Sequence, residues 1–358
     1  MVVHHAIKLV PKTPFHLGEM MDMESTEDII HSDTIYSALC RISDVFFGKA
    51  EYKKFIDPFL NEDPSFIISS AFPYYEAEKE TIFFFPKPLI FKDFVAKNPK
   101  AIKTYKKIRF VSKHLLNAFL NNDDEYLHKN FMNENGKLKR KNLIQNGQVW
   151  LSEAEKELIP YTEDLWKIQR SPRVVIDRST KNTSIFHYSR IHFHKGKTGL
   201  YLLIDNLKKN ENIAEELITK FRYLGDTGLG GERSTGNGQF SVMLNKSGKL
   251  FHIELDQGDN SSKRFLSLSL FLPKEEEINN NLIGDNNYYS IINRKGWISG
   301  TSYRRRNINM ITEGSVLNTV NSKIYGRIEE ITPNILKTKH PDYKIHRFGY
   351  SYSINLKN

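Results

Sequence analysis

The chain has 358 residues, of which 39% are hydrophobic and 12% aromatic, and it carries a formal net charge of +10. This composition excludes a disordered chain, leaves room for two domains, and favours polyanionic partners such as nucleic acid. The single cysteine, Cys40, excludes an intrachain disulfide and a cysteine cage for zinc, and we expect neither a metal nor a cofactor. Without a long apolar run or a leader-like start, the chain is expected to be cytoplasmic and to have no contact with a membrane.

The first 150 residues predict a strand, a helix, two further strands and an insert. Residues 6–10 form an apolar strand, and Ser32 is placed to cap a helix with apolar residues at helical spacing, namely Ile35, Leu39, Ile42 and Phe46. Residues 66–71 and 81–85 predict two strands. Residues 92–148 form a basic insert with helical character, whose lysines either face solvent or contact RNA or a partner.

A projecting hairpin, which we call the thumb, is predicted within residues 170–200. Residues 173–177 and 184–193 alternate as strands on either side of a polar tip that contains Arg178 and Lys181. Period-two spacing places Phe186, Tyr188, Arg190 and His192 on one face. This face either stacks against RNA bases or packs on its own domain.

The remaining elements complete the order strand, helix, two strands, helix, strand of a split βαβ unit. They are a strand at 200–204, a helix at 213–224, a glycine-rich loop at 225–239 and a strand at 240–244. The first domain is therefore predicted to span residues 1–248. A polar linker near 256–260 and strands at 265–271, 288–293, 307–311 and 348–354 predict a second domain at 249–358, as a degenerate copy of the first.

The glycine-rich loop is the strongest signal in the sequence. Glycines admit positive φ and let main-chain N–H groups surround an anion, and the guanidinium of Arg233 is suited to phosphate. A Walker A loop is excluded because Glu232, Arg233 and Ser234 stand where it needs Gly-Lys-Ser, and a Rossmann fingerprint is excluded because the loop follows a helix and precedes a strand. The loop is predicted to bind a phosphodiester chain.

The loop sequence GLGGERSTGNGQF at 228–240 resembles the C-terminal glycine-rich motif of the RAMP superfamily of CRISPR-associated proteins. Residues 14–19 and 31–39 resemble the N-terminus of the Csm-complex subunit that caps the 5′ end of the guide RNA. Residues 173–178 and 184–186 resemble its thumb, and residues 310–316 and 340–350 its second domain. The insert at 92–148 matches no pattern of that family.

This resemblance implies an α+β protein with two ferredoxin-like, RRM-like domains, a projecting thumb hairpin and a helical insert. It implies a non-catalytic subunit of a type III-A CRISPR interference complex in antiviral defence. Such a subunit anchors the repeat-derived 5′ handle of the crRNA and bridges the large polymerase-like subunit to the backbone RAMP subunit. Its thumb lies near target RNA at the junction of handle and spacer.

The resemblance and the side-chain chemistry together assign the RNA contacts. In the loop these are Gly228, Gly230, Gly231, Arg233, Ser234, Thr235, Gly236 and Gly238; in the thumb they are Arg173, Arg178, Lys181 and Phe186; elsewhere they are His16, Ser32 and Arg304. Ser32 is included because helix N-termini favour phosphate, although simple N-capping is an equal alternative. Arg304 opens an arginine run that contacts phosphate or an acidic partner, or is solvated.

Three alternatives remain open at this point. A metal-independent endonuclease that cuts repeat RNA would use histidines as acid and base, with His16, His31, His187 and His192 as candidates. A repeated backbone subunit would cut target RNA with a loop aspartate, for which Asp33 is the nearest candidate. A basic scaffold would contact no RNA at all.

Overall fold

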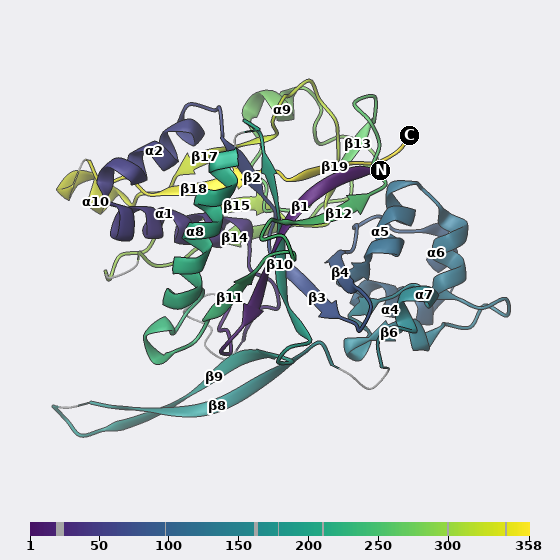
Figure 1. Ribbon diagram of the computed structural model, residues 1–358, viewed down its shortest axis with the longest axis horizontal. Coiled ribbons are helices and arrows are strands. Elements are labelled where there is room, and N and C mark those ends of the chain that lie inside the picture. The colour runs from purple at the N-terminus through teal and green to yellow at the C-terminus, as the bar shows by residue number, and fades with distance from the viewer. Residues whose placement is uncertain are drawn as a thin grey trace.

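The structure, a computed structural model, describes residues 1–18, 25–96, 98–160, 164–177, 179–209, 211–298, 301–340 and 342–358. It confirms the α+β class. One large sheet runs through the middle of the molecule, with helices at one end, the insert at the other, and the thumb projecting away from both (Figure 1). Among the described helices, none is both long and apolar enough to cross a bilayer.

The large sheet has the strand order β11-β1-β10-β3-β4-β5-β7-β6, with β12 also paired to β1 and β2 to β10. Its central strands are β1 (Val2–Pro11), β10 (Thr198–Asn206), β3 (Phe72–Glu76) and β11 (Phe240–Met243), followed by β2 (Phe66–Ile68), β4 (Thr81–Pro86) and β12 (Phe251–Leu255). Each of the neighbouring pairs among β11, β1, β10 and β3 is antiparallel. This is the order expected of a split βαβ unit.

Three helices lie alongside this sheet, at the end away from the insert: α1 (Ser32–Phe47), α2 (Lys49–Leu60) and α8 (Glu211–Thr227) (Figure 1). The predicted apolar face of α1 is confirmed, because Ile35, Leu39 and Ile42 are buried. Phe46 differs, since it is 48% exposed and packs against Tyr223 of α8 at 5.1 Å between ring centroids. Sequence patterning did not identify α2 and β3, which contain Pro58 and Pro73.

The insert is helical as predicted and also extends the large sheet. Its helices are α3 (Asp93–Ala96), α4 (Pro99–Lys107), α5 (Lys113–Leu120), α6 (Asp124–Phe131) and, just beyond it, α7 (Glu153–Lys156); its strands are β5 (Phe110–Ser112), β6 (Leu143–Ile144) and β7 (Val149–Trp150). Buried Gln145, at φ +51°, hydrogen-bonds the main chain of Leu165 and Trp166 where the thumb begins. The insert therefore supports the start of the thumb.

The thumb is an antiparallel ribbon of β8 (Trp166–Ile176) and β9 (Thr183–Phe193), as the sequence predicts. It leaves the body and ends in solvent (Figure 1). Asp177 accepts hydrogen bonds from the main-chain N–H groups of Ser179 and Thr180 at the tip. The register places Arg173 opposite Phe186 and Ser171 opposite Tyr188.

The C-terminal part consists of small sheets rather than a second large one. Its elements are β13 (Arg264–Ser267), α9 (Glu275–Asn279), β14 (Ile291–Arg294), β15 (Ile308–Ile311), β16 (Val316–Asn318), β17 (Gly326–Glu330), α10 (Asn334–Lys339), β18 (His346–Tyr350) and β19 (Ser353–Asn355). Strands β16, β13 and β19 form one sheet, and β14–β15 and β17–β18 form two pairs. The second ferredoxin-like domain therefore stays a prediction.

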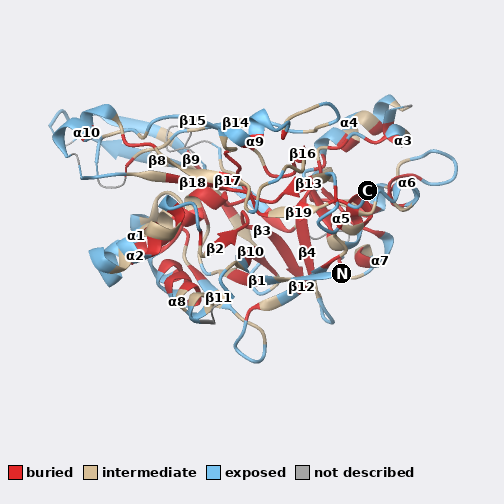
Figure 2. Cartoon of the chain, turned by 90° about the horizontal axis from the view of Figure 1, so that it is seen from above, coloured by how far each residue is buried: buried red, intermediate tan, exposed pale blue. Residues whose placement is uncertain are grey.

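The core is continuous between the two parts of the chain. Phe348 and Tyr350 of β18 belong to the same buried cluster as Tyr36 of α1, and the rings of Tyr36 and Phe348 stack at 4.9 Å. Buried residues occupy the space between the large sheet and the C-terminal strands (Figure 2). Because β12 still pairs with β1, the large sheet extends past the boundary predicted at residue 248.

Candidate nucleic-acid interface

The glycine-rich loop lies against the segment that precedes α1, and close packing explains its glycines. A Cβ on Gly230 would lie 2.5 Å from the carbonyl oxygen of His16, and one on Gly238 would lie 2.0 Å from that of Leu229. The main-chain N–H groups of Gly231 and Gly238 donate to the carbonyls of His16 and Pro14. The loop is therefore held firmly against residues 14–17.

Hydrogen bonds within the protein use several of the main-chain donors that the predicted anion nest would need. The N–H groups of Gly228, Gly231, Gly236 and Gly238 all donate to protein carbonyls. A main-chain donor that is already bonded gains little by turning to a ligand. An RNA contact of this loop stays a prediction, and among its groups the side chain of Arg233 is the best suited to phosphate.

The first strand of the thumb meets the loop at Arg173. Its Nη1 lies 2.8 Å from Oε2 of Glu232, and its guanidinium lies 4.4 Å from the ring centroid of Tyr188. The side chains of Arg173 and Glu232 are 30% and 25% exposed, so both remain accessible to a ligand. We call the group formed by His16, Arg173, Tyr188, Glu232 and Arg233 the thumb-root site.

Two buried polar atoms in the thumb-root site have no hydrogen-bond partner. The ring of His16 packs on that of Tyr188 at 4.8 Å, and Nδ1 of His16 lies 2.8 Å from the carbonyl oxygen of Ser189. Nε2 of His16 and the hydroxyl of Tyr188 are buried without a partner among the described residues. A buried polar group without a partner costs about 1–3 kcal/mol, which marks a place for a water or ligand atom.

The electrostatics of the thumb-root site are mainly basic. Burial and the nearby Arg41 guanidinium lower the pKa of Arg233, because like charges oppose each other there. Arg190 lies 5.8 Å from the ring of Tyr188 and hydrogen-bonds Ser171. Such a concentration of guanidinium groups attracts phosphate.

Burial differs along the predicted stripe on the thumb. Tyr188 is buried within the thumb-root site, whereas Phe186, nearer the tip, is half-buried. Lys181, at the tip itself, is exposed and has φ +58°. Arg178 lies outside the described residues. On the opposite face of the ribbon, Val174, Ile176 and Ile185 are 56%, 61% and 67% exposed, an aliphatic surface that the sequence analysis did not single out.

Ser32 is a correction, because the structure places it away from any surface. Its side chain is fully buried, and its hydroxyl accepts a hydrogen bond from the N–H of Leu270. His31 occupies the N-cap position in its place. The C-terminal part covers this helix end, so neither the predicted N-cap nor the predicted phosphate contact of Ser32 is present.

Asp33 is a second correction, because it is a structural ion-pair residue rather than a loop aspartate. Arg294 binds both carboxylate oxygens at 3.1 Å, and Arg347 binds one of them. Although burial opposes ionisation, Arg294 and Arg347 hold the pKa of Asp33 well below its usual value. A carboxylate enclosed by two guanidinium groups is poorly placed to attack or activate RNA, so the structure gives the backbone-subunit alternative no support.

His31 is buried between two carboxylates and is equally unsuited to acid–base catalysis. Nδ1 lies 2.8 Å from Glu313 and Nε2 lies 3.2 Å from Glu27. Although burial lowers it, the two carboxylates, Glu313 before Glu27, raise the pKa of His31 to about 10. Of the other histidines proposed for catalysis, His187 is exposed and His192 half-buried on opposite faces of β9.

The stability of the protein is expected to fall between pH 6.5 and pH 9 because of His31. Its pKa is raised in the folded state, so its contribution is complete below about pH 6.5 and declines as pH rises towards 10. Urea unfolding of the wild type and of His31→Gln should differ by on the order of 2 kcal/mol more at pH 6 than at pH 9. An equal difference at both pH values would contradict a charged His31.

Arg304 lies beside Trp297 in the C-terminal part of the chain. It is exposed, its guanidinium lies 4.8 Å from the ring centroid of Trp297, and the next residue, Arg305, hydrogen-bonds Ser37. The arginine run at 304–306 thus packs partly against the body. An RNA contact of Arg304 stays a prediction.

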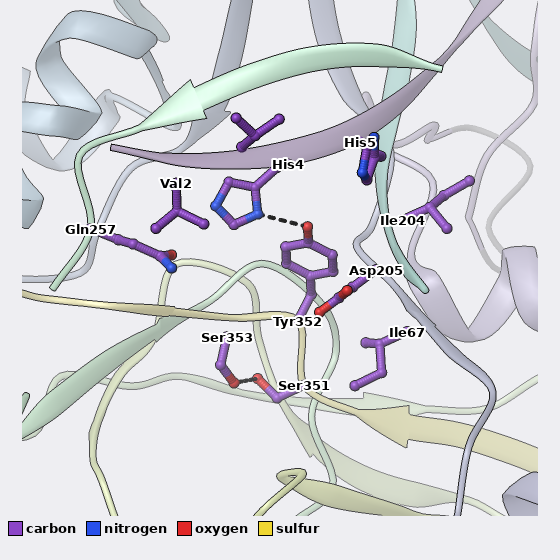
Figure 3. Close-up of a pocket in the computed structure, with 11 residues that line it drawn as sticks. Val2, His4, His5, Ile67, Ile204, Asp205, Gln257, Ser351, Tyr352 and Ser353 are labelled. Carbon is purple, nitrogen blue, oxygen red and sulfur yellow. Dashed lines mark hydrogen bonds between the residues drawn. The ribbon is translucent and has the colours of Figure 1, made fainter. Parts of the chain in front are cut away.

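A pocket of about 200 Å³ lies between β1 and the C-terminal strands (Figure 3). His4 and Tyr352 hydrogen-bond across it at 2.9 Å, and burial lowers the pKa of His4 to about 4. Its lining contains no lysine or arginine, so it is poorly suited to phosphate. Within the described ranges, no group of three or more His, Cys, Asp or Glu side chains is arranged to hold a metal ion.

Sequence reasoning missed Glu232 and Arg41 as members of this interface. Glu232 was noted only as evidence against a Walker A loop, although an acid inside a basic loop was itself a signal. Arg41 is exposed, on the side of α1 away from the buried positions Leu39 and Ile42. Its position off the apolar face was the available clue.

Comparisons with known proteins agree with the resemblance drawn from the sequence. Residues 260–356 match the family described as CRISPR Csm4 C-terminal domain. The chain is 26% identical over 315 residues to the "CRISPR system Cms protein Csm4" of Thermococcus onnurineus, covering 87% of this chain and 86% of the relative. It is 24% identical over 351 residues to the protein of the same name from Methanocaldococcus jannaschii, covering 91% and 88%.

Two solved structures share this fold over nearly the whole chain. One is a Csm3–Csm4 subcomplex of the type III-A CRISPR-Cas interference complex, with a TM-score of 0.62, 18% identity, and coverage of 99% of this chain and 100% of that one. The other is a Csm1–Csm4 cassette in complex with cA4, with a TM-score of 0.57, 19% identity, and coverage of 99% and 98%. At this level of identity the likeness concerns the fold.

Proposed function

We propose that this chain, which is similar to Csm4 proteins over most of its length, is the non-catalytic subunit that anchors the 5′ repeat handle of the crRNA in a type III CRISPR complex. The observation that carries the proposal is the thumb-root site, where the thumb meets the glycine-rich loop at the ion pair of Arg173 and Glu232, and where Arg233 follows Glu232 in the chain. Guanidinium groups beside an aromatic ring suit a single-stranded RNA backbone. RNA then runs from this site along the thumb.

The thumb itself is proposed to lie near target RNA at the junction of handle and spacer. Val174, Ile176 and Ile185 form an exposed aliphatic surface towards its end, and Lys181 adds a charge at the tip. Apolar side chains of this kind insert between bases, while a basic tip attracts phosphate.

The proposed protein partners are a large polymerase-like subunit and a backbone RAMP subunit, which the chain would bridge. The solved relatives named Csm4 occur with Csm1 and with Csm3, which supports both partners. In this arrangement the chain works in the cytoplasm, as one ferredoxin-like domain at residues 1–248 and a degenerate copy at 249–358.

Replacing Arg233 by alanine is expected to weaken RNA binding roughly five- to tenfold, because a charge-assisted contact to phosphate is lost. Filter binding of a 5′-labelled repeat RNA across a salt series measures this. The slope of log affinity against log salt should become shallower by about one. Arg327→Ala, which removes a charge from β17 outside the thumb-root site, should change neither value.

Two outcomes would count against the proposal. A flat salt titration of the wild type would favour a scaffold that does not touch RNA. Specific cleavage of the repeat RNA in EDTA, lost on His16→Ala, would favour the endonuclease alternative. The burial of His16 and of His31 gives that alternative no support.

A further inference from the structure

We propose that Glu232 occupies, in the RNA-free protein, the place on Arg173 that an RNA phosphate takes on binding. Glu232 thus acts as an internal counter-anion that the transcript must displace. The inference rests on the proposed function of the thumb-root site and adds a specificity-determining residue to it.

The ion pair has the geometry of a displaceable contact. Nη1 of Arg173 lies 2.8 Å from Oε2 of Glu232, and Nη2 lies 3.5 Å from the hydroxyl of Thr235. Both charged side chains are about one quarter to one third exposed, so the pair is neither sealed in the core nor fully solvated. Arginine binds carboxylate and phosphate with the same fork of donors, so one anion can replace the other.

The loop holds Glu232 in place by its main chain. Glu232 has φ +55°, a left-handed conformation that costs a residue with a Cβ about 1 kcal/mol. Its carbonyl oxygen accepts hydrogen bonds from Thr235 and from the side chain of Asn237. The hydroxyl of Thr235 also lies 3.4 Å from Oε2 of Glu232. The bonds to the carbonyl oxygen do not involve the carboxylate, so they can hold the loop in shape when the carboxylate leaves Arg173.

An acid at this position works against binding a polyanion unless it has a separate role. Arg41 and Arg233 surround the same loop with positive charge, and Glu232 cancels part of it. Any RNA must compete with the Glu232 carboxylate for Arg173. A transcript that also binds the rest of the thumb-root site displaces this carboxylate more readily than non-specific RNA does. Glu232 therefore lowers affinity for any RNA and does so most for weakly bound RNA.

The exchange also has a distinct salt signature. A phosphate that pairs with an unpaired arginine releases a counterion from the RNA, which makes binding more salt-dependent. When the phosphate displaces Glu232, the released carboxylate recruits a cation, and the two effects cancel. Removing the carboxylate should therefore raise both the affinity and the salt dependence.

The test uses the full chain, a 5′-labelled oligouridylate and fluorescence anisotropy across a salt series. Glu232→Gln, which keeps the shape of the side chain, is expected to bind roughly fivefold more tightly at low salt, with a slope steeper by about 0.7. Glu215→Gln, an exposed residue of α8, is the matched change in charge and should leave both values unchanged.

A double-mutant cycle connects the effect to Arg173. In the Arg173→Ala background, Glu232→Gln should change RNA affinity less than twofold, because the guanidinium of Arg173 that Glu232→Gln would free for phosphate is absent. Unchanged or weaker binding by Glu232→Gln alone would overturn the exchange while leaving the proposed function intact. If the wild type and every variant fail to bind the probe, the proposed function fails, and the exchange fails with it.

Discussion

Replacing Asp33 by alanine is expected to lower the free energy of unfolding by about 3–5 kcal/mol, the usual cost of breaking a buried ion pair from one side. Asp33 is 3% exposed and holds Arg294 of β14 and Arg347 of β18 against the start of α1. Without the carboxylate, the largely buried guanidinium groups of Arg294 and Arg347 lose the counter-charge that they share. Urea unfolding followed by circular dichroism measures the loss.

The matched control for this prediction is Asp44→Ala on the same helix. Asp44 is exposed, so its removal should cost less than about 0.5 kcal/mol. Asp33→Asn keeps the shape and removes the charge, and it should fall between the two. A cost below about 1 kcal/mol for Asp33→Ala would mean that the C-terminal part is not held to α1 through this pair.

Replacing Gly238 by alanine is expected to destabilise the protein by about 2–4 kcal/mol and to lower RNA affinity more than tenfold. A Cβ there would lie 2.0 Å from the carbonyl oxygen of Leu229, at φ +79°. Relief would break the hydrogen bond from the N–H of Leu229 to the carbonyl of Gly238. The loop would then leave residues 14–17 and withdraw Arg233 from the thumb-root site.

Gly236→Ala is the matched control because it separates backbone strain from lack of space. Gly236 has nearly the same conformation, φ +81°, but a Cβ there meets nothing within 4 Å. It should cost only about 1 kcal/mol and leave RNA binding within threefold of the wild type. If Gly236→Ala instead lost RNA binding at full stability, that glycine would touch the ligand, and the loop would have a direct main-chain role.

These two positions show what the glycine-rich pattern meant. Six glycines in sixteen residues identified a loop of special backbone geometry, and the sequence placed it correctly between a helix and a strand. The anion nest predicted from it stays a prediction, and four of its glycine N–H groups are already bonded to the carbonyls of residues 14, 16, 224 and 233. A sequence shows that a donor exists, but not which acceptor lies opposite.

The burial of Ser32 and Asp33 was missed for the same reason. Their position at a helix start was predicted correctly, yet their burial depends on Leu270, Arg294 and Arg347, which are more than 200 residues away in the chain. The pairing of Arg173 with Glu232, 59 residues apart, was likewise hidden. Each of these contacts forms only when separate elements pack together.

Sequence patterns alone identify the local elements: the first strand, helix α1, the thumb ribbon, helix α8 and the glycine-rich turn. Hydrophobic period, turn residues and glycines report backbone geometry over a few residues, so these elements could be identified from it. Which polar groups are buried, which are paired and which stay accessible to a ligand can be read only from the folded structure. Those properties depend on long-range packing, which brings a neutralising or covering group from a distant part of the chain.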